Sequence, residues 1–372
     1  QKITTWLESY VDYQRNTNRM ISSQLFGFDV GSNFTLAASA PNNPFTTAVN
    51  VAYPFTGLWT GLKTSNTVTR VAGGLVAKLP GEWQAGLDYV CGRNACRFQD
   101  DNPLLRPTYG SALSTGVLDV MRDLNLRPLN YQPYLVSGQA TDDHGKSLSN
   151  SLTLRTSGPT FRLPNGPVVV SASVEWRDDR NTENVSAGRD GSEETLSYFY
   201  YTPEVSGEGK SGYMEARVPL LAAEDGPSKQ ARLELQVAGR YDSSRATTVA
   251  RPDFPLIPSP QGPFPATPMI TRDFSSSSYT AGLRYAPVTD LVLRASFGTG
   301  FLAPDTSQLM GPELDSIPID VSDPKRGGIL ETVGPVDYII GGNPDLEPER
   351  SKSYAAGIVY TPRFWPGLRV SV

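Results

Sequence analysis

This sequence has few cysteine and histidine residues, the usual ligands of transition metals. It contains two cysteines, Cys91 and Cys96, and a single histidine, His144. Structural zinc sites normally take four Cys and His ligands, so this set predicts no metal site. The two cysteines are predicted at the end of a strand. In an oxidising compartment they close a small disulfide at the base of a loop, or else they are two unrelated small apolar residues. The sequence leaves both interpretations open.

Paired acids and a glycine-rich stretch are the remaining candidates for chemistry. Asp178-Asp179 and Glu193-Glu194 lie in a polar stretch, where solvated charge is the ordinary interpretation. Asp100-Asp101 is interpreted in the same way, with calcium binding as the weaker alternative. Gly298-Thr299-Gly300 lacks the spacing and the strand-to-helix context of a phosphate loop. No serine nucleophile elbow is present, and His144 has no evident partner. We predict no catalytic residue, no cofactor and no enzyme activity.

Composition and charge exclude two classes of protein. The 372 residues carry a net charge of −5, with both signs spread along the chain, so no basic patch for nucleic acid is expected. Mean hydropathy is −0.31, and no apolar run approaches the roughly 18 residues of a membrane-spanning helix. The chain has 34 glycines and 31 prolines, which separate short runs of alternating residues. This composition indicates an all-β fold and leaves a membrane β-barrel possible.

Hydrophobic alternation with a period of two predicts about eleven strands. From Leu291 to Phe301, for example, mostly apolar residues alternate with small or polar residues, which gives the strand one apolar face. Short turns at Leu79–Glu82, Asn165-Gly166 and Pro362–Gly367 alternate with much longer connections. The predicted strands are Thr5–Gln14, Thr67–Lys78, Trp83–Cys91, Ser147–Arg155, Val168–Arg177, Met214–Leu220, Leu233–Asp242, Tyr279–Tyr285, Leu291–Phe301, Ser353–Tyr360 and Leu368–Val372.

The alternation of short and long connections favours a barrel that spans a membrane. Apolar faces of the predicted strands tend to end in aromatic residues, and the opposite faces carry charges in mid-strand. An up-and-down antiparallel transmembrane β-barrel has these features, with short periplasmic turns, long extracellular loops and aromatic girdles. One long connection is expected to hold a short helix at Ser111–Leu124. A soluble β-sandwich remains the alternative, because alternation alone does not distinguish inside from outside.

Two motifs in the last quarter of the chain point to a family. Leu293–Leu309 reads LRASFGTGFLAPDTSQL, and Gly341–Tyr360 reads GGNPDLEPERSKSYAAGIVY. Together they resemble the late barrel strands of TonB-dependent outer-membrane receptors, in which a Phe-x-Ala-Pro box precedes an Asn-Pro-Asp-Leu-x-Pro-Glu box. The residues that carry the resemblance are Phe301, Ala303, Pro304, Asn343, Pro344, Asp345, Leu346, Pro348 and Glu349.

The resemblance implies a receptor of the cell outer membrane that takes up a scarce solute. The expected partners are outer-membrane lipid, a small solute and a TonB-type energy-coupling protein that acts through a plug region not recognisable here. The solute is a siderophore, cobalamin, a carbohydrate or a peptide. Haem is disfavoured, because Leu302 replaces the arginine usual in haem receptors and no histidine lies between the boxes. Loop aromatics Phe45, Tyr53 and Trp59 either contact the ligand or pack loops together.

The domain prediction is one unit, residues 1–372, forming an incomplete segment of a larger barrel. Barrels of this kind have even strand numbers, and plugged transporters have about 22 strands. Alone, the segment is expected to aggregate through its unpaired strand edges and apolar face. The alternative function is a soluble extracellular β-rich binding or adhesion module, or a carbohydrate-active domain. An enzyme of that kind would need two facing carboxylates about 5 to 10 Å apart.

Overall fold

The computed structural model describes most of the chain, with gaps in the connections. The described residues are 2–25, 33–52, 59–100, 104–106, 108–136, 141–189, 196–221, 231–251, 256–322, 324–328 and 330–372. Among them, no helix combines the length and the apolar character needed to cross a membrane.

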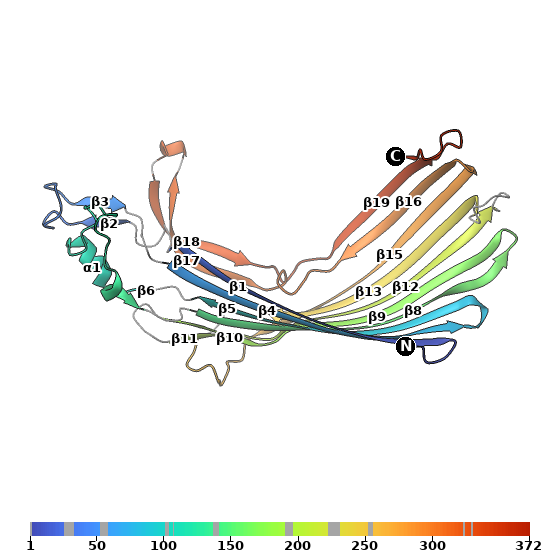
Figure 1. Cartoon of the computed structure of the whole chain (residues 1–372), viewed down its shortest axis with the longest axis horizontal. Helices are drawn as coiled ribbons and strands as arrows, with labels where there is room; N and C mark the ends of the chain where they lie inside the picture. Colours follow the sequence, from blue (N-terminus) through green and yellow to red (C-terminus); the bar gives the residue numbers. More distant parts are fainter. Residues whose placement is uncertain are drawn as a thin grey trace.

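One large antiparallel sheet forms the body of the molecule (Figure 1). Along its main path the strands follow chain order, so neighbours in the sheet are successive long strands. This order confirms the predicted up-and-down all-β fold. The path consists of β1 (Leu7–Leu25), β4 (Trp59–Leu79), β5 (Trp83–Asp100), β8 (Thr141–Leu163), β9 (Gly166–Asn181), β12 (Val205–Leu221), β13 (Leu233–Val249), β15 (Met269–Val288), β16 (Leu291–Leu302), β19 (Glu349–Tyr360) and β20 (Val370–Ser371).

The sheet is an open trough whose two ends differ. β1 and β20 lie at its edges, and no pairing joins them within the described ranges. In Figure 1 the short turns and both chain termini lie at the right end, which we call the turn end. The 3-10 helix η1 (Pro80–Glu82) makes the turn between β4 and β5, and Gly166 adopts φ 135 in the turn predicted at Asn165-Gly166. The long connections leave from the opposite end, the loop end.

Several strands extend further toward the loop end than the sequence predicts. β1 continues to Leu25 instead of ending at Gln14, and β5 continues to Asp100 instead of Cys91. The extensions carry polar residues on both faces, so the hydrophobic alternation stops before the main-chain pairing does. Polar cross-strand contacts accompany that pairing, as where the Thr17 and Thr67 hydroxyls lie 3.2 Å apart. The 18 residues of β5 rise about 60 Å, roughly twice the apolar thickness of a bilayer.

Two long connections fold together into a loop-end module, which comprises residues 33–52, 104–106 and 108–136. A hydrogen bond of 2.9 Å from Ala37 N to Ser114 O and another of 2.9 Å from Asn42 Nδ2 to Asp119 Oδ1 join the two connections. The module has its own apolar core around Tyr109, which packs against Phe34 and Val51. Its elements are β2 (Asn33–Leu36), β3 (Val49–Ala52), β6 (Leu104–Leu105), α1 (Thr108–Ser114), η2 (Gln132–Tyr134) and β7 (Leu135–Val136).

The helix predicted at Ser111–Leu124 has different bounds in the structure. It begins earlier, at Thr108, and ends at Ser114. Gly116 adopts φ 77, and its N–H donates to Leu113 O at 3.0 Å, which is a common way for a helix to end. The apolar residues beyond it, Leu118 and Val120, are buried in the module core without being helical.

Other elements at the loop end were not predicted. The stretch 302–350 was interpreted as irregular because of its prolines and glycines, but it contains a hairpin. Pro318 lies at a register shift between Ile317 and Ile319, and this shift interrupts the alternating pattern by which a strand is predicted. The hairpin consists of β17 (Pro312–Ser322) and β18 (Leu330–Gly341) with η3 (Pro324–Arg326) between them. The polar stretch 178–211 and the Pro-rich stretch 243–278 likewise contain β10 (Asn184–Gly188), β11 (Tyr198–Thr202) and β14 (Leu256–Ile257).

Candidate solute path and loop-end site

The large sheet has an apolar face that no second layer covers in the described part of the chain. The register places Leu87, Leu154 and Val174 in one row of this face, across β5, β8 and β9. Val174 is 62% exposed and Met214 is 60% exposed. The exposed large residues of the apolar face are Val11, Tyr13, Val71, Leu75, Leu87, Tyr89, Leu152, Leu154, Val174, Met214, Val237, Tyr241, Tyr279, Leu283, Tyr354, Ile358 and Tyr360.

Aromatic side chains mark both limits of the apolar face. Along β15, Tyr279 and Tyr285 point to this face six positions apart. The same spacing separates Trp83 from Tyr89 in β5 and Tyr354 from Tyr360 in β19. Six residues of strand rise about 20 Å, close to the apolar band of about 25 Å in membrane barrels. Exposed apolar area of this extent, bounded by aromatic rings, matches a lipid-facing wall.

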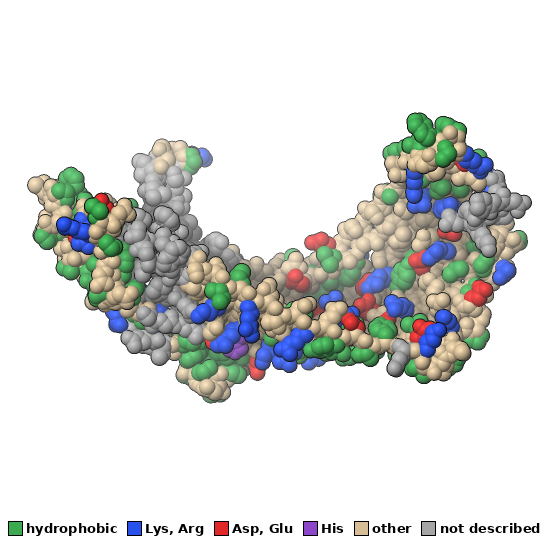
Figure 2. All heavy atoms as spheres, viewed as in Figure 1, with side chains coloured by type: hydrophobic (Ala, Val, Ile, Leu, Met, Phe, Trp, Pro, Cys, Tyr) green, Lys and Arg blue, Asp and Glu red, His purple; other side chains and the backbone are tan. Residues whose placement is uncertain are grey.

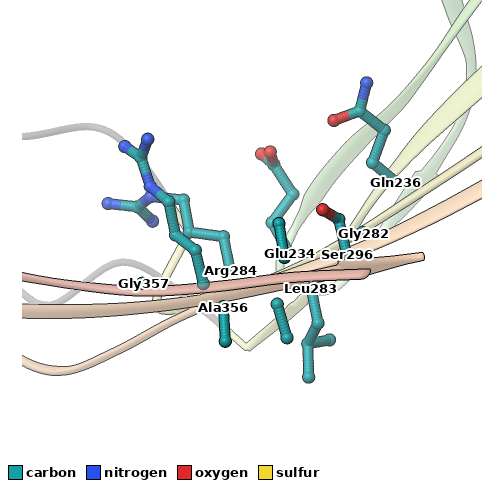
Figure 3. A pocket seen from close by; sticks show the side chains of 11 residues that line it. Glu234, Gln236, Gly282, Leu283, Arg284, Ser296, Ala356 and Gly357 are labelled. Carbon is teal, nitrogen blue, oxygen red and sulfur yellow. The ribbon is translucent and has the colours of Figure 1, made fainter. Parts of the chain in front are cut away.

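The opposite side of the sheet, the polar face, carries charged side chains of both signs. Figure 3 shows the two faces near β13 and β15: Glu234, Gln236 and Arg284 project to one side, and Leu283 and Ala356 to the other. Charged side chains of both signs are spread along the sheet in Figure 2. Ion pairs of the polar face include Arg70–Asp12 (2.9 Å), Arg155–Asp88 (2.9 Å), Arg177–Asp179 (2.5 Å), Arg217–Glu215 (3.2 Å) and Arg240–Asp242 (2.8 Å).

These ion pairs are suited to a wet surface. The arginine side chains are roughly half exposed, for example 60% for Arg155 and 41% for Arg240. Exposed pairs of this kind contribute about 0–1 kcal/mol each to stability. Their effect is a hydrated wall with little net charge. A soluble sandwich would bury its apolar face under a second layer, whereas none of the residues that the structure describes forms such a layer over this face.

The first motif box ends β16 and forms a locked turn. Phe301 pairs with Arg350 in the ladder between β16 and β19, and Ala303 and Pro304 follow the strand. Asp305 Oδ1 accepts hydrogen bonds from Ser307 N (2.8 Å), Ser307 Oγ (2.7 Å) and Gln308 N (2.9 Å). In return, Asp305 N donates to Gln308 Oε1 at 3.0 Å. This reciprocal arrangement is that of a capping box, and it fixes the turn.

The second box returns the chain to the first. Asn343 N donates to Gln308 O at 2.7 Å, which joins the two boxes directly. Asn343 Oδ1 accepts from Asp345 N at 2.9 Å, an Asx turn. Arg272 of β15 then donates to Pro344 O and to Asp345 Oδ1, both at 2.8 Å. Leu346 and Pro348 lead into β19, where Glu349 pairs with Leu302. The sequence predicted both boxes and their order; their contact depends on the fold.

The first box also lines a cavity at the loop end of the polar face. This loop-end cavity has a volume of about 430 Å³. Residues 303–306 line one side, and Arg177 and Asp179 of β9, Gly207 of β12 and Ser244 of β13 line the others. Because β13 and β15 separate β12 from β16 in the sheet, the first box must cross the polar face to reach these strands. It therefore lies where a solute would meet the polar face from the loop end.

We predict that the turn at Asp305 loosens in acid. Hydrogen bonds from Ser307 and Gln308 hold the Asp305 pKa below its ordinary value of 3.8. A depressed carboxyl pKa stabilises the fold fully above the unfolded-state pKa, and this contribution is lost as pH falls through the folded-state pKa. Hydrogen-exchange protection of the Ser307 and Gln308 amides should therefore fall below about pH 4. In Asp305→Asn this pH step should vanish; an unchanged step in that variant would contradict the assignment.

Of the three aromatic residues predicted to contact a ligand, only Phe45 has a side chain among the described residues. Phe45 lies on the loop-end module, 56% exposed, and its N–H donates to Asn43 Oδ1 at 2.9 Å. Tyr53 lies outside the described residues. Trp59 is the first residue of β4, and its side chain is outside what the structure describes. Exposed Phe45 is thus available for contact with a ligand, and its role stays a prediction.

The structure is incompatible with the disulfide alternative. Cys91 and Cys96 are free and lie inside β5, not at its end. Five positions of extended strand place the two side chains on opposite faces, about 17 Å apart along the chain. A disulfide needs Cβ atoms about 3.8 Å apart. The disulfide was one of two open alternatives because the polar half of β5 was interpreted as a loop.

We therefore predict two titratable thiols in the denatured, unreduced protein. A thiol reagent such as Ellman's reagent should count both, and prior reduction should leave the count unchanged. A count near zero that rises after reduction would contradict the structure.

Comparison with known proteins identifies the family. The family described as "TonB dependent receptor-like, beta-barrel" matches residues 5–372. No curated protein matches the sequence. Similar solved structures include the alcaligin outer-membrane receptor FauA from Bordetella pertussis, with 14% identity, 96% of this chain and 44% of that chain covered, and a TM-score of 0.41.

Two further solved receptors match at similar levels. The hemophore receptor HasR of Serratia marcescens, in complex with its hemophore HasA and heme, shows 12% identity, covers 94% of this chain and 52% of that chain, and has a TM-score of 0.38. A mutant of the ferric enterobactin receptor PfeA of Pseudomonas aeruginosa shows 12% identity, covers 99% of this chain and 48% of that chain, and has a TM-score of 0.29. The chain spans about half the length of these receptors.

Family membership settles the predicted class and location. Members of this family are receptors of the Gram-negative outer membrane and are not enzymes, in agreement with the predicted class and location. Because the match at residues 5–372 takes in the whole strand path of the sheet, the chain belongs to the TonB-dependent receptor-like β-barrel family.

Proposed function

We propose that this chain is part of the wall of an outer-membrane transporter that takes up a scarce solute. The observation that carries the proposal is the two-sided sheet, with an uncovered apolar face on one side and a hydrated, charge-paired face on the other. Lipid covers the first face, and the solute passes along the second. The loop-end cavity, lined by the first motif box, is where the solute first meets the polar face.

The proposed transporter contains more than this chain. Further strands of the same protein close the trough into a barrel around a plug, and residues 1–372 act as a single wall unit. A TonB-type protein supplies energy through the plug. β1 and β20 lie unpaired with each other at the two edges of the described sheet, which supports this arrangement.

The proposed substrate is a siderophore, cobalamin, a carbohydrate or a peptide. Leu302 at the position of the usual arginine, and the absence of histidine between the boxes, argue against haem. The charges of the polar face are largely paired, for example Arg177 with Asp179 beside the cavity, and this favours polar solutes over strongly charged ones. Phe45 on the loop-end module, with Tyr53 and Trp59, would stack on the incoming solute.

Uptake in cells tests the function and separates the substrate classes. The complete gene is deleted, and growth is measured with each candidate solute as the sole source of iron, cobalamin, carbon or amino acid. The proposal expects one class to fail, rescue by the plasmid-borne gene, and no rescue in a strain without TonB. Normal growth on all four classes, or rescue that does not depend on TonB, would overturn it.

A further inference from the structure

A second pocket lies on the outer wall of the sheet, away from the polar face. This outer-wall pocket has a volume of about 400 Å³ and lies at the loop end of β8. His144 and Lys146 are separated from Leu152 by even numbers of residues in β8, so the three side chains lie on the same side of the sheet, the apolar side. Lys146 lies six positions from Leu152, or about 20 Å along the strand. The pocket therefore lies just beyond the apolar face, where a barrel emerges from lipid.

Three strands and one connection build the pocket. β10 pairs with β8 through Ala187 and Asp142, and β11 pairs with β10 through Tyr201 and Val185. The connection between β14 and β15 then places Phe264 over this wall. The rings of Phe264 and Tyr201 stack with centroids 4.5 Å apart and an angle of 7° between planes. Tyr201 is 8% exposed, whereas Phe264 keeps 37% of its surface exposed. An aromatic surface thus remains open at the pocket.

Polar groups around this ring provide both donors and acceptors. Tyr201 Oη donates to Glu183 Oε2 at 3.1 Å, and burial together with this bond raises the Tyr201 pKa, so the hydroxyl stays protonated. Arg97 holds Asp142 with two hydrogen bonds of 3.0 and 2.7 Å, which neutralises that carboxylate. His144 and Lys146 are exposed and line the same pocket as Glu183.

We propose that the outer-wall pocket binds a saccharide. The apolar C–H face of a sugar ring packs on Phe264, while its hydroxyls accept from Lys146 and His144 and donate to Glu183. Charges of both signs balance here, which suits an uncharged, hydroxyl-rich ligand better than an ion. The sugar comes from a glycolipid headgroup in the surrounding leaflet or from a free oligosaccharide. The site lies outside the proposed solute path, so it is independent of uptake.

Saturation-transfer NMR on the full-length receptor in detergent tests the site with two free sugars, lactose and N,N′-diacetylchitobiose. A parallel arm uses phosphatidylcholine nanodiscs with and without digalactosyl diacylglycerol. Wild type should show transfer to ring protons of at least one probe. Transfer only to the glycolipid assigns a lipid headgroup as the source, and transfer to the free sugars assigns an oligosaccharide.

Matched variants locate the binding. Phe264→Ala should weaken affinity about tenfold, a loss of about 1.4 kcal/mol, whereas Phe161→Ala should leave it unchanged, because Phe161 is also exposed (60%) but lies at the turn end. Since Phe264→Ala also disturbs Tyr201, Lys146→Ala serves as a second variant without a ring contact and should weaken binding about threefold. No transfer to any probe in wild type, or unchanged affinity in both pocket variants, would overturn the proposal. Uptake should be the same in all variants.

Discussion

Val174→Arg is expected to destabilise the assembled barrel by about 2–4 kcal/mol, whereas Ser173→Arg one position away should cost less than about 1 kcal/mol. Val174 lies on the apolar face, 62% exposed, in a row with Leu154. In lipid an arginine there loses its hydration, while an arginine at Ser173 extends into the hydrated polar face. The two sites share a strand and differ by one register position, so their difference isolates the environment of each face.

The free energy of unfolding of both variants is measured by urea titration of the full-length protein in lipid vesicles. The folded fraction at each urea concentration is read from the heat-dependent shift of folded barrels in gels. If the apolar face lay against water, an arginine at a 62%-exposed position would be almost neutral. Equal stability of the Val174→Arg and Ser173→Arg variants would therefore contradict a lipid-facing wall.

Gly342→Ala is expected to reduce solute uptake at least about tenfold while the barrel still assembles. A Cβ atom at Gly342 would lie 2.1 Å from Gln308 O and 2.7 Å from Met310 O. Because these are backbone atoms, the clash is not relieved by a side-chain rotation, and the hydrogen bond from Asn343 N to Gln308 O must break. We expect the loss to cost about 1–3 kcal/mol of stability at this junction. The first box then loses its position over the loop-end cavity.

A second glycine serves as the control for that prediction. Gly239 lies in β13, and a Cβ there meets nothing within 4 Å, so Gly239→Ala should leave uptake unchanged. Hydrogen exchange should report faster exchange at Asn343 in Gly342→Ala alone. Normal uptake by Gly342→Ala together with faster exchange would show that the junction is not needed for transport.

The strand path was predictable where membrane and water impose alternation on the sequence. In β16, Leu293, Ala295 and Phe297 had to face one side, and the pattern gave that strand correctly. Aromatic residues such as Tyr279 and Tyr285 marked the limits of the apolar face for the same reason. Beyond the apolar face both sides of a strand contact water, so the polar continuation of β5 past Cys91 shows no hydrophobic alternation from which a strand could be predicted.

The loop-end site could be predicted only in part. The two boxes were visible as motifs, but the bond from Asn343 to Gln308 joins main-chain atoms and needs no particular side chain at Gln308. The outer-wall pocket depends on register: Phe264 and Tyr201 are far apart in sequence and meet only because β11 extends the sheet. The hairpin of β17 and β18 was not predicted because Pro318 interrupts the alternating pattern of the sequence. The pairing of the two strands nevertheless continues on both sides of the register shift at Pro318.

The central claim is that one face of the sheet contacts lipid and the other contacts water. A nitroxide scan of β9 from Val170 to Arg177 tests it directly, with single cysteines introduced into full-length protein in vesicles after replacement of Cys91 and Cys96. We predict that collision with oxygen peaks at Val170, Ala172, Val174 and Trp176, and that collision with a water-soluble nickel chelate peaks at Ser171, Ser173, Glu175 and Arg177. Equal access of the nickel chelate at every position, or no two-residue period, would contradict the claim.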